Sequence, residues 1–345
     1  PTPLESYSAQ LGGRLAWSQR VDGFGYALQP ALVGPDVVVA SSDGTVVAFD
    51  AATGGERWRG NAGARVVAGV GSDGRTSAVA TAANEVVALE GGAVKWRQRI
   101  GSRIATAPLV AGERVFAMGV DRSVHAFDAQ DGRRLWVLQR PGETLTLAQN
   151  GVLAPYKDTL LAGQGPRLAG IDPNTGDVRW ELPLAAPRGT NELERLSDLL
   201  GPLLRLGDTV CARAFQAAVG CIDAAGGQLR WSRNVGGTEA IGGDAELLFG
   251  ADASDRISAW RTGSGDVAWT SERLLYRGLS APAALPRAAV FGDAEGQVHF
   301  LDRASGATLL RMPTDGSEVI GAPVVAGGTV IVATRKGGLF AFAIN

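Results

Sequence analysis

The chain has 345 residues, of which 48 are glycine, 33 are basic and 35 are acidic, so its formal net charge is −2. Glycine stands at about twice its ordinary frequency without an excess of proline, which excludes a collagen-like or disordered chain and is typical of many tight turns. The near-neutral charge argues against nucleic acid as a partner, because phosphate binding needs a surplus of clustered Lys and Arg. No apolar run approaches the length of about 18 residues that a membrane-spanning helix needs.

Seven of the eight tryptophans recur at intervals of 38 to 51 residues. They are Trp17, Trp58, Trp96, Trp136, Trp180, Trp231 and Trp269. Most of them end the motif Ala-x-Asp-x-x-x-Gly-x-x-x-Trp, complete or with single replacements. The Asp and Gly positions of this motif are Asp50 and Gly54, Asp128 and Gly132, Asp172 and Gly176, Asp223 and Gly227, and Gly265. A self-similar period of about 40 residues indicates a repeat architecture.

Each repeat contains short strands separated by turns. Residues 37–40 and 46–49 are apolar runs on either side of Ser42-Asp43-Gly44, a pattern that predicts a hairpin. Residues 56–58 begin an outer strand, and small-residue segments such as 105–110 supply an inner one. Four short strands in about 40 residues are typical of a propeller blade, and no stretch has the sustained period of 3.6 that predicts helices.

Counting the repeats gives eight blades. Seven complete units fit between about residues 27 and 310, and the strands at 329–333 and 338–343 lack an outer partner. Residues 13–17 match the missing outer strand. The sequence therefore predicts an all-β protein, a single domain over 1–345. Its fold is an eight-bladed β-propeller of four-stranded antiparallel blades, and the N-terminal strand closes the ring by pairing with the C-terminal strands.

The repeated Trp, Asp and Gly residues have two interpretations. They could be a set of ligand-binding aromatics, or they could pack neighbouring blades together and shape the turns. A residue that is present in every blade cannot mark one site, so we favour the structural interpretation. Trp260 lies off the repeat positions and replaces Phe49 or Phe127 of other blades, so we expect it in the core.

The cysteines and histidines give weak signals for chemistry. Cys211 and Cys221 flank a turn near Gln216 on neighbouring strands, where they form either a disulfide or inert core thiols. His125 and His299 occupy equivalent strand positions in different blades without a nearby carboxylate cluster, so we expect packed or exposed side chains. Calcium needs six to eight oxygen ligands, and no Asp- or Asn-rich loop supplies them. We expect no metal and no cofactor.

The docking motif resembles that of the pyrroloquinoline-quinone-type propellers. Two families share it, the quinoprotein alcohol dehydrogenases and the outer-membrane assembly factor BamB family. Residues 191–198 lie within the longest interval between tryptophans, in an insertion over about 185–200, and are similar to the E-x-x-R-L-S-D segment of the BamB family. Residues 274–277 and 292–299 also resemble that family.

This resemblance implies a non-enzymatic scaffold on the periplasmic side of the outer membrane. The scaffold would bind the POTRA domains of the BamA insertase and reach the membrane only through a lipid anchor, which we expect outside this chain. The resemblance carries over two partner-binding loops, formed by Leu145 and Leu147 and by Arg195, Leu196, Ser197, Asp198 and Leu200. Ala148 and Leu200 stand where the family pattern has an Arg and a second acid. From the residues alone, leucines mixed with Arg and carboxylates favour either a small interface anchor or a loop that caps the blade edge.

Two other functions stay open. A quinone-dependent dehydrogenase shares the repeat, but the dehydrogenase family implies a longer chain and adjacent cysteines, whereas Cys211 and Cys221 lie ten residues apart. A periplasmic propeller could also bind unfolded outer-membrane proteins by strand addition without BamA.

Overall fold

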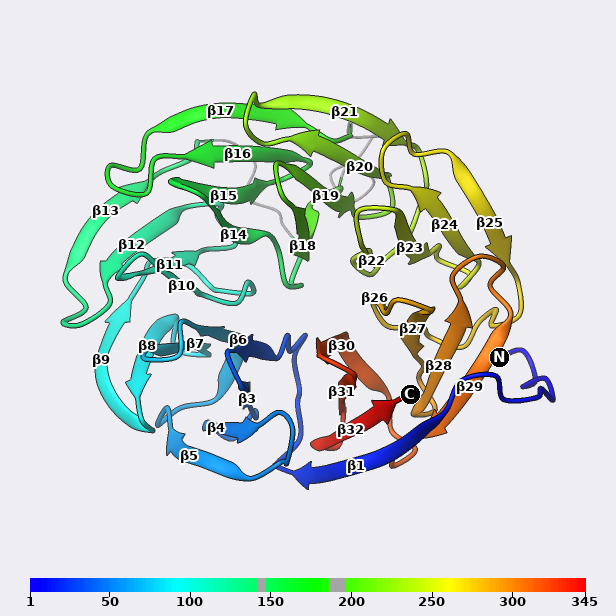
Figure 1. Cartoon of the computed structure of the whole chain (residues 1–345). Helices are drawn as coiled ribbons and strands as arrows, with labels where there is room; N and C mark the ends of the chain where they lie inside the picture. The colour runs from blue at the N-terminus through cyan, green and yellow to red at the C-terminus, as the bar shows by residue number, and fades with distance from the viewer. Residues whose placement is uncertain (142–146, 186–195) are drawn as a thin grey trace.

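The computed structural model describes residues 1–141, 147–185 and 196–345, and these residues form strands and turns without a helix. Accordingly, the described part of the chain contains no helix that is long and apolar enough to cross a membrane. The strands form eight antiparallel sheets of four strands each, arranged as a ring of blades (Figure 1). This confirms the predicted eight-bladed β-propeller.

The blades follow chain order, and each runs from an inner to an outer strand. Blade 1 consists of β2 (Ala31–Val33), β3 (Asp36–Ala40), β4 (Thr45–Asp50) and β5 (Glu56–Asn61). Blade 2 consists of β6 (Val66–Ser72), β7 (Ser77–Thr81), β8 (Glu85–Glu90) and β9 (Ala93–Arg99). Blade 3 consists of β10 (Leu109–Ala111), β11 (Arg114–Met118), β12 (Val124–Asp128) and β13 (Arg134–Leu138). Blades 4 and 5 consist of β14 (Leu153–Tyr156), β15 (Thr159–Gln164), β16 (Arg167–Ile171) and β17 (Val178–Pro183); and β18 (Leu199–Leu206), β19 (Thr209–Ala214), β20 (Ala218–Asp223) and β21 (Gln228–Arg233). Blades 6 to 8 consist of β22 (Gly242–Gly243), β23 (Leu247–Ala251), β24 (Ile257–Arg261) and β25 (Val267–Ser271); β26 (Ala283–Ala284), β27 (Ala288–Gly292), β28 (Gln297–Asp302) and β29 (Thr308–Pro313); and β30 (Val319–Ala326), β31 (Thr329–Thr334), β32 (Gly338–Ile344) and β1 (Gly13–Arg20).

The ring closes where the two ends of the chain meet. Strand β1 pairs antiparallel with β32, from Gly13 opposite Ile344 to Arg20 opposite Gly338. This pairing gives blade 8 its outer strand, as predicted. It also removes the free sheet edge that an open array of blades would expose.

The inner strand of blade 3 is shorter than predicted. We expected it over 105–110, but β10 begins only at Leu109. The residues before it are held by the next blade, because the backbone N–H of Ala107 donates to the side-chain carbonyl of Asn150 at 2.9 Å. Crowding at the axis limits regular pairing, since a Cβ placed on Gly71 would lie 1.9 Å from the carbonyl oxygen of Pro108.

Most of the repeated tryptophans join one blade to the next. The indole Nε1 of Trp17 donates to the carbonyl of Ala51 at 2.9 Å, and a Cβ placed on Gly54 would lie 2.6 Å from its ring. Four other tryptophans donate in the same way, Trp96 to Ala129, Trp136 to Pro173, Trp231 to Thr262 and Trp269 to Arg303. These contacts are the interblade packing that the repeat predicts.

The Asp and Gly of the motif build the turn that receives the tryptophan. The Asp50 carboxylate accepts the backbone N–H groups of Ala52 and Thr53 at 2.8 and 2.9 Å. Gly54 closes the turn at φ +75°, a conformation that strongly favours glycine. The second and third strands of the blades are largely buried and form the core between neighbouring blades. Trp260 is 1% exposed in this core, as expected.

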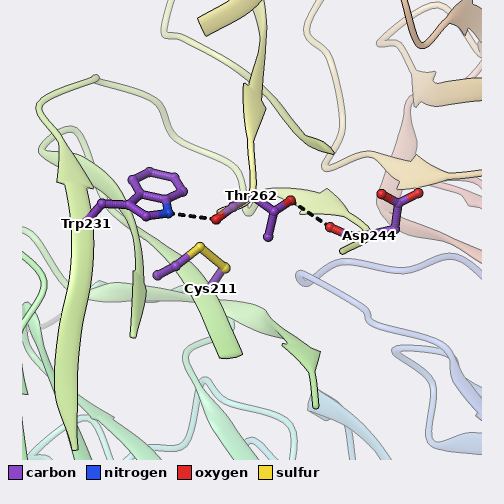
Figure 2. The surroundings of a disulfide bond; sticks show 5 residues. Cys211, Trp231, Asp244 and Thr262 are labelled. Carbon is purple, nitrogen blue, oxygen red and sulfur yellow. Dashed lines mark hydrogen bonds between the residues drawn. A yellow bond between two sulfur atoms is a disulfide. The ribbon is translucent and has the colours of Figure 1, made fainter. Parts of the chain in front are cut away.

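The two cysteines lie directly opposite each other on β19 and β20, with their Cα atoms 4.1 Å apart. Of the two alternatives, the structure contains the disulfide. Both side chains are buried, and Cys221 is also paired with the docking residue Trp231 on β21. Figure 2 shows Trp231 donating to the carbonyl of Thr262, whose hydroxyl donates to the carbonyl of Asp244. The disulfide thus lies beside the contact that joins blades 5 and 6.

Candidate protein-binding site

The antiparallel order of each blade divides the turns between two faces of the ring. The turns between the third and fourth strands form what we call the docking face, because they receive the tryptophans. The turns between the second and third strands end at the opposite face, where the connections between blades also lie. We call this the connection face. The two predicted partner-binding loops are connections between blades, one before β14 and one that runs into the start of β18 at Leu200, so both belong to the connection face.

The structure brings the two predicted loops into direct contact. The backbone N–H of Leu147 donates to Oδ2 of Asp198 at 2.9 Å. A hydrogen bond to a carboxylate is stronger than one between neutral groups. Leu145 and Arg195 lie outside the described residues, so the observed contact between the loops is the one made by Leu147 and Asp198.

Asp198 is held by three parts of the propeller. In addition to Leu147, it lies 3.5 Å from Nη2 of Arg122, measured from its Oδ1 atom. Its backbone carbonyl accepts the N–H of Phe215 at 2.9 Å. The carboxylate therefore stands in a fixed position, with 15% of the side chain exposed.

The leucines and the serine of the loops differ in exposure. Leu147 and Leu196 are half-buried, whereas Ser197 and Leu200 are only 4% and 3% exposed. Leu200 packs into a cluster with Ala240, to which Leu147 also contributes. Leu147 and Leu196 can therefore offer apolar surface to a partner, while Ser197 and Leu200 can act by positioning the loop.

We call these residues the joined-loop surface. It comprises Leu147, Leu196 and Asp198, with Ser197 and Leu200 beneath them. A shallow notch lies beside it, lined among others by Thr106, Met118, Arg122, Gln149 and Gly165. Together with Arg122 in the notch, the surface combines apolar side chains with one carboxylate and one guanidinium, a composition that suits a protein interface.

Arg122 is not among the residues predicted from the sequence. The family pattern places an Arg at position 148, which is Ala148 here, yet a guanidinium reaches Asp198 from the turn between β11 and β12. One signal was present in the sequence. Asp121-Arg122 occupies the hairpin tip that reads Asp43-Gly44 in blade 1, and a long charged side chain replaces the turn glycine.

The histidines differ in one respect from the expectation. His299 does contact a carboxylate, because its Nε2 lies 2.8 Å from Oδ2 of the buried Asp293, which also accepts Nε of Arg277 at 2.8 Å. Burial nevertheless lowers the pKa of His299, against the opposing effect of Asp293. Burial likewise lowers the pKa of His125, which contacts Ser123 Oγ at 2.9 Å. Within the described ranges, no group of three or more His, Cys, Asp or Glu side chains is placed to hold a metal ion.

Three comparisons place this propeller among known proteins. The family profile described as "Outer membrane protein assembly factor BamB" matches residues 9–65, 42–271 and 275–345. The outer membrane protein assembly factor BamB of Bordetella pertussis is 36% identical over 98% of this chain and 89% of its own length. The crystal structure of BamB from Moraxella catarrhalis has a TM-score of 0.86 at 22% identity, covering 96% of this chain and all of that one.

A quinohemoprotein alcohol dehydrogenase from Comamonas testosteroni also has this fold, with a TM-score of 0.69 at 17% identity, over 96% of this chain and 76% of that one. At that identity the likeness concerns the fold alone. The structure is thus a propeller of the tryptophan-docking class. Within that class, the chain belongs to the outer membrane protein assembly factor BamB family.

Proposed function

We propose that this chain is a non-enzymatic accessory subunit of the β-barrel assembly machinery, and that it binds the POTRA domains of a BamA-type insertase. The relatives are named as outer membrane protein assembly factors, and they match this chain over nearly its full length. The binding site in this proposal is the joined-loop surface on the connection face.

The hydrogen bond between Leu147 and Asp198 is the observation that carries this proposal. It connects two loops separated by a whole blade, so two half-buried leucines and a carboxylate lie on one surface. Groups that are fixed before binding lose little conformational freedom when the complex forms, so more of their contact energy contributes to affinity.

The proposed location is the periplasmic side of the outer membrane, reached through a lipid anchor. The disulfide between Cys211 and Cys221 supports an oxidising compartment, because disulfides persist in the periplasm and are rare in the cytosol.

Binding to a purified POTRA fragment of the cognate BamA, measured by biolayer interferometry, tests the proposal. Asp198→Ala removes the acceptor for Leu147, so we expect affinity to fall at least about tenfold, as for a lost charge-assisted hydrogen bond. The sequence prediction extends the same expectation to Arg195→Ala. Asp198→Asn keeps an oxygen acceptor for Leu147 and should fall between the wild type and Asp198→Ala.

Asp266→Asn is the matched control, because Asp266 is an exposed carboxylate on the docking face. It should bind like the wild type. Unchanged affinity of Asp198→Ala and Arg195→Ala, with melting temperatures near the wild-type value, would contradict the proposed site. Dehydrogenase activity after addition of pyrroloquinoline quinone and Ca²⁺ would contradict the non-enzymatic role.

A further inference from the structure

Every blade places one residue with a left-handed backbone in the turn between its second and third strands. These eight equivalent residues are Gly44 (φ +104°), Asn84 (+60°), Arg122 (+66°), Gly165 (+64°), Gln216 (+52°), Asp255 (+65°), Gly296 (+81°) and Gly337 (+96°). The turn requires this conformation, which glycine adopts freely and asparagine and aspartate tolerate. Arg122 and Gln216 are the two residues whose type is unfavourable there, and a strained residue that persists is a reason to search for a function.

Internal contacts account for Gln216 and for its neighbour in blade 6. The side-chain oxygen of Gln216 accepts the N–H of Gly237 at 3.0 Å, which braces the next connection between blades. Asp255 accepts the N–H groups of Gly278 and Leu279 at 2.8 and 3.2 Å and braces the following connection. In both turns, the hydrogen bonds of the side chain within the propeller offset the cost of the backbone strain.

Arg122 makes only a weaker contact of this kind, with Asp198. Within the described part of the chain its guanidinium makes no hydrogen bond, and its one ionic contact is the 3.5 Å approach to Asp198. That distance is too long for a hydrogen bond. Asp198 already accepts Leu147, and Nε of Arg122 is buried without a partner. Among the described residues, the strained turn therefore holds a guanidinium whose donors have no hydrogen-bonded acceptor.

The position of this guanidinium is defined by its surroundings. It lies against the backbone of Gly165 in the neighbouring turn, where an added Cβ would lie 3.1 to 3.4 Å from the guanidinium atoms. The side chain keeps 26% of its surface exposed, beside the notch and the half-buried Leu147. A planar guanidinium fixed at the rim of an apolar notch is suited to hold a carboxylate through two parallel hydrogen bonds.

We propose that Arg122 binds a carboxylate side chain of the partner, and that the bound segment places an apolar side chain next to this carboxylate, in the notch beside Leu147. This inference rests on the proposed function, and its partner is the POTRA region of the insertase. Charge complementarity selects an acidic contact, because the donors that lack an acceptor among the described residues belong to the Arg122 cation.

The test uses Arg122→Gly, with the purified POTRA fragment as the probe. Four of the eight equivalent turns carry glycine at this position, so the variant should keep or raise the melting temperature. Its affinity for the fragment should fall at least about tenfold, because the guanidinium is lost. Arg122→Lys keeps the charge but loses the planar guanidinium that can donate two parallel hydrogen bonds, so its affinity should lie between those of the wild type and Arg122→Gly. Asn84→Gly makes the equivalent change in blade 2, away from the joined-loop surface, and should bind like the wild type.

A double-mutant cycle separates partner binding from support of Asp198. Asp and Glu residues exposed on the fragment are changed one at a time to Asn or Gln and titrated against wild type and Arg122→Gly. One of them should couple to Arg122 by at least fivefold, and none should couple to Asn84. Unchanged affinity of Arg122→Gly, or additivity at every carboxylate, would overturn the inference and leave the proposed function standing. Failure of the wild-type chain to bind the fragment would overturn the proposed function itself.

Discussion

The two faces of the propeller are built on different plans. On the docking face, one arrangement of Asp, Gly and Trp recurs from blade to blade, with the indole of one blade resting on the turn of the next. On the connection face, equivalent turns carry different residues, such as Arg122, Gln216 and Asp255, with different contacts. Repetition therefore serves the stability of the ring, while departures from the repeat provide the distinct chemistry of one site.

Blade 8 shows that the docking contact tolerates a change of side chain. Leu310 replaces the tryptophan of blade 7, and Gly13 supplies the receiving glycine at the start of β1. A Cβ placed on Gly13 would lie 2.6 Å from Cδ2 of Leu310. The contact between blades 7 and 8 thus keeps its apolar packing without an indole hydrogen bond.

The largest effect is expected on the docking face, from Gly132→Ala. A Cβ there would lie 2.5 Å from the Trp96 ring, and the residue has φ +74°. The left-handed conformation costs about 1 kcal/mol or more, and displacing the indole from Ala129 adds its packing and hydrogen bond, so we expect a loss of about 3 kcal/mol. Urea denaturation would measure it.

Gly112→Ala is the matched control for this substitution. Gly112 also has positive φ, at +58°, but a Cβ would meet nothing within 4 Å. It should lose only the conformational part, about 1 kcal/mol. Equal losses in the two variants would mean that tryptophan docking contributes little to stability.

A smaller effect is expected from removing the disulfide beside the docking residue Trp231. Replacing Cys211 and Cys221 together by Ala should lower the free energy of unfolding by about 2–3 kcal/mol, because the cross-link restricts a short loop of the unfolded chain. A thiol count on denatured, non-reduced protein should find no free thiol. Two free thiols, or unaltered stability of the double variant, would show that the disulfide does not stabilise blade 5.

The smallest effect concerns pH and the buried histidines. Burial lowers the pKa of His299 and of His125 below the ordinary value of about 6.5. As pH falls below about 6.5, the unfolded chain therefore takes up protons before the native chain. Each histidine reduces the free energy of unfolding by at most about 1.4 kcal/mol per pH unit until its native pKa is reached.

The variant His299→Gln isolates this contribution. Glu239 acts in the opposite direction. It lines a pocket between the inner ends of several blades, where desolvation raises its pKa to about 7, although more than a third of the residue is exposed. The native chain therefore takes up this proton before the unfolded chain, and the free energy of unfolding rises as pH falls. Asp293 has a lowered pKa despite its burial, so its stabilisation is lost only at more acidic pH. Thermal denaturation between pH 5 and 7.5 should show a shallower decline for the variant. Parallel curves for variant and wild type would contradict the expected protonation of His299.

Much of the fold could be predicted because its determinants are local and repeated. The spacing from Asp50 through Gly54 to Trp58 specifies a turn and an outer strand, and seven such units together with the unpaired strands at the two chain ends specify eight blades. The length of the inner strand could not be predicted. Its boundary at Leu109 depends on the Asn150 side chain and on crowding near Gly71, and both lie far from it in the sequence.

The candidate site could be predicted only in part. Leu147 and Asp198 could be selected from their loops, but their hydrogen bond joins residues 51 positions apart. Arg122 sits in a short hairpin of blade 3, and its importance follows from tertiary packing, which leaves its donors without a hydrogen-bonded acceptor in the described part of the chain.

By itself, the sequence determined the ring: its blade number, its closure by the first strand and the tryptophan contacts between neighbours. These features depend on residues that lie close together in each repeat, so the pattern can be recognised without knowing which distant residues they contact. Tertiary structure alone decided which of the alternatives held at the cysteines, how far each loop residue is exposed, and that Arg122 meets Asp198. Those properties arise from the approach of separate blades, and the distances and burial created there decide which polar groups remain free to bind a partner.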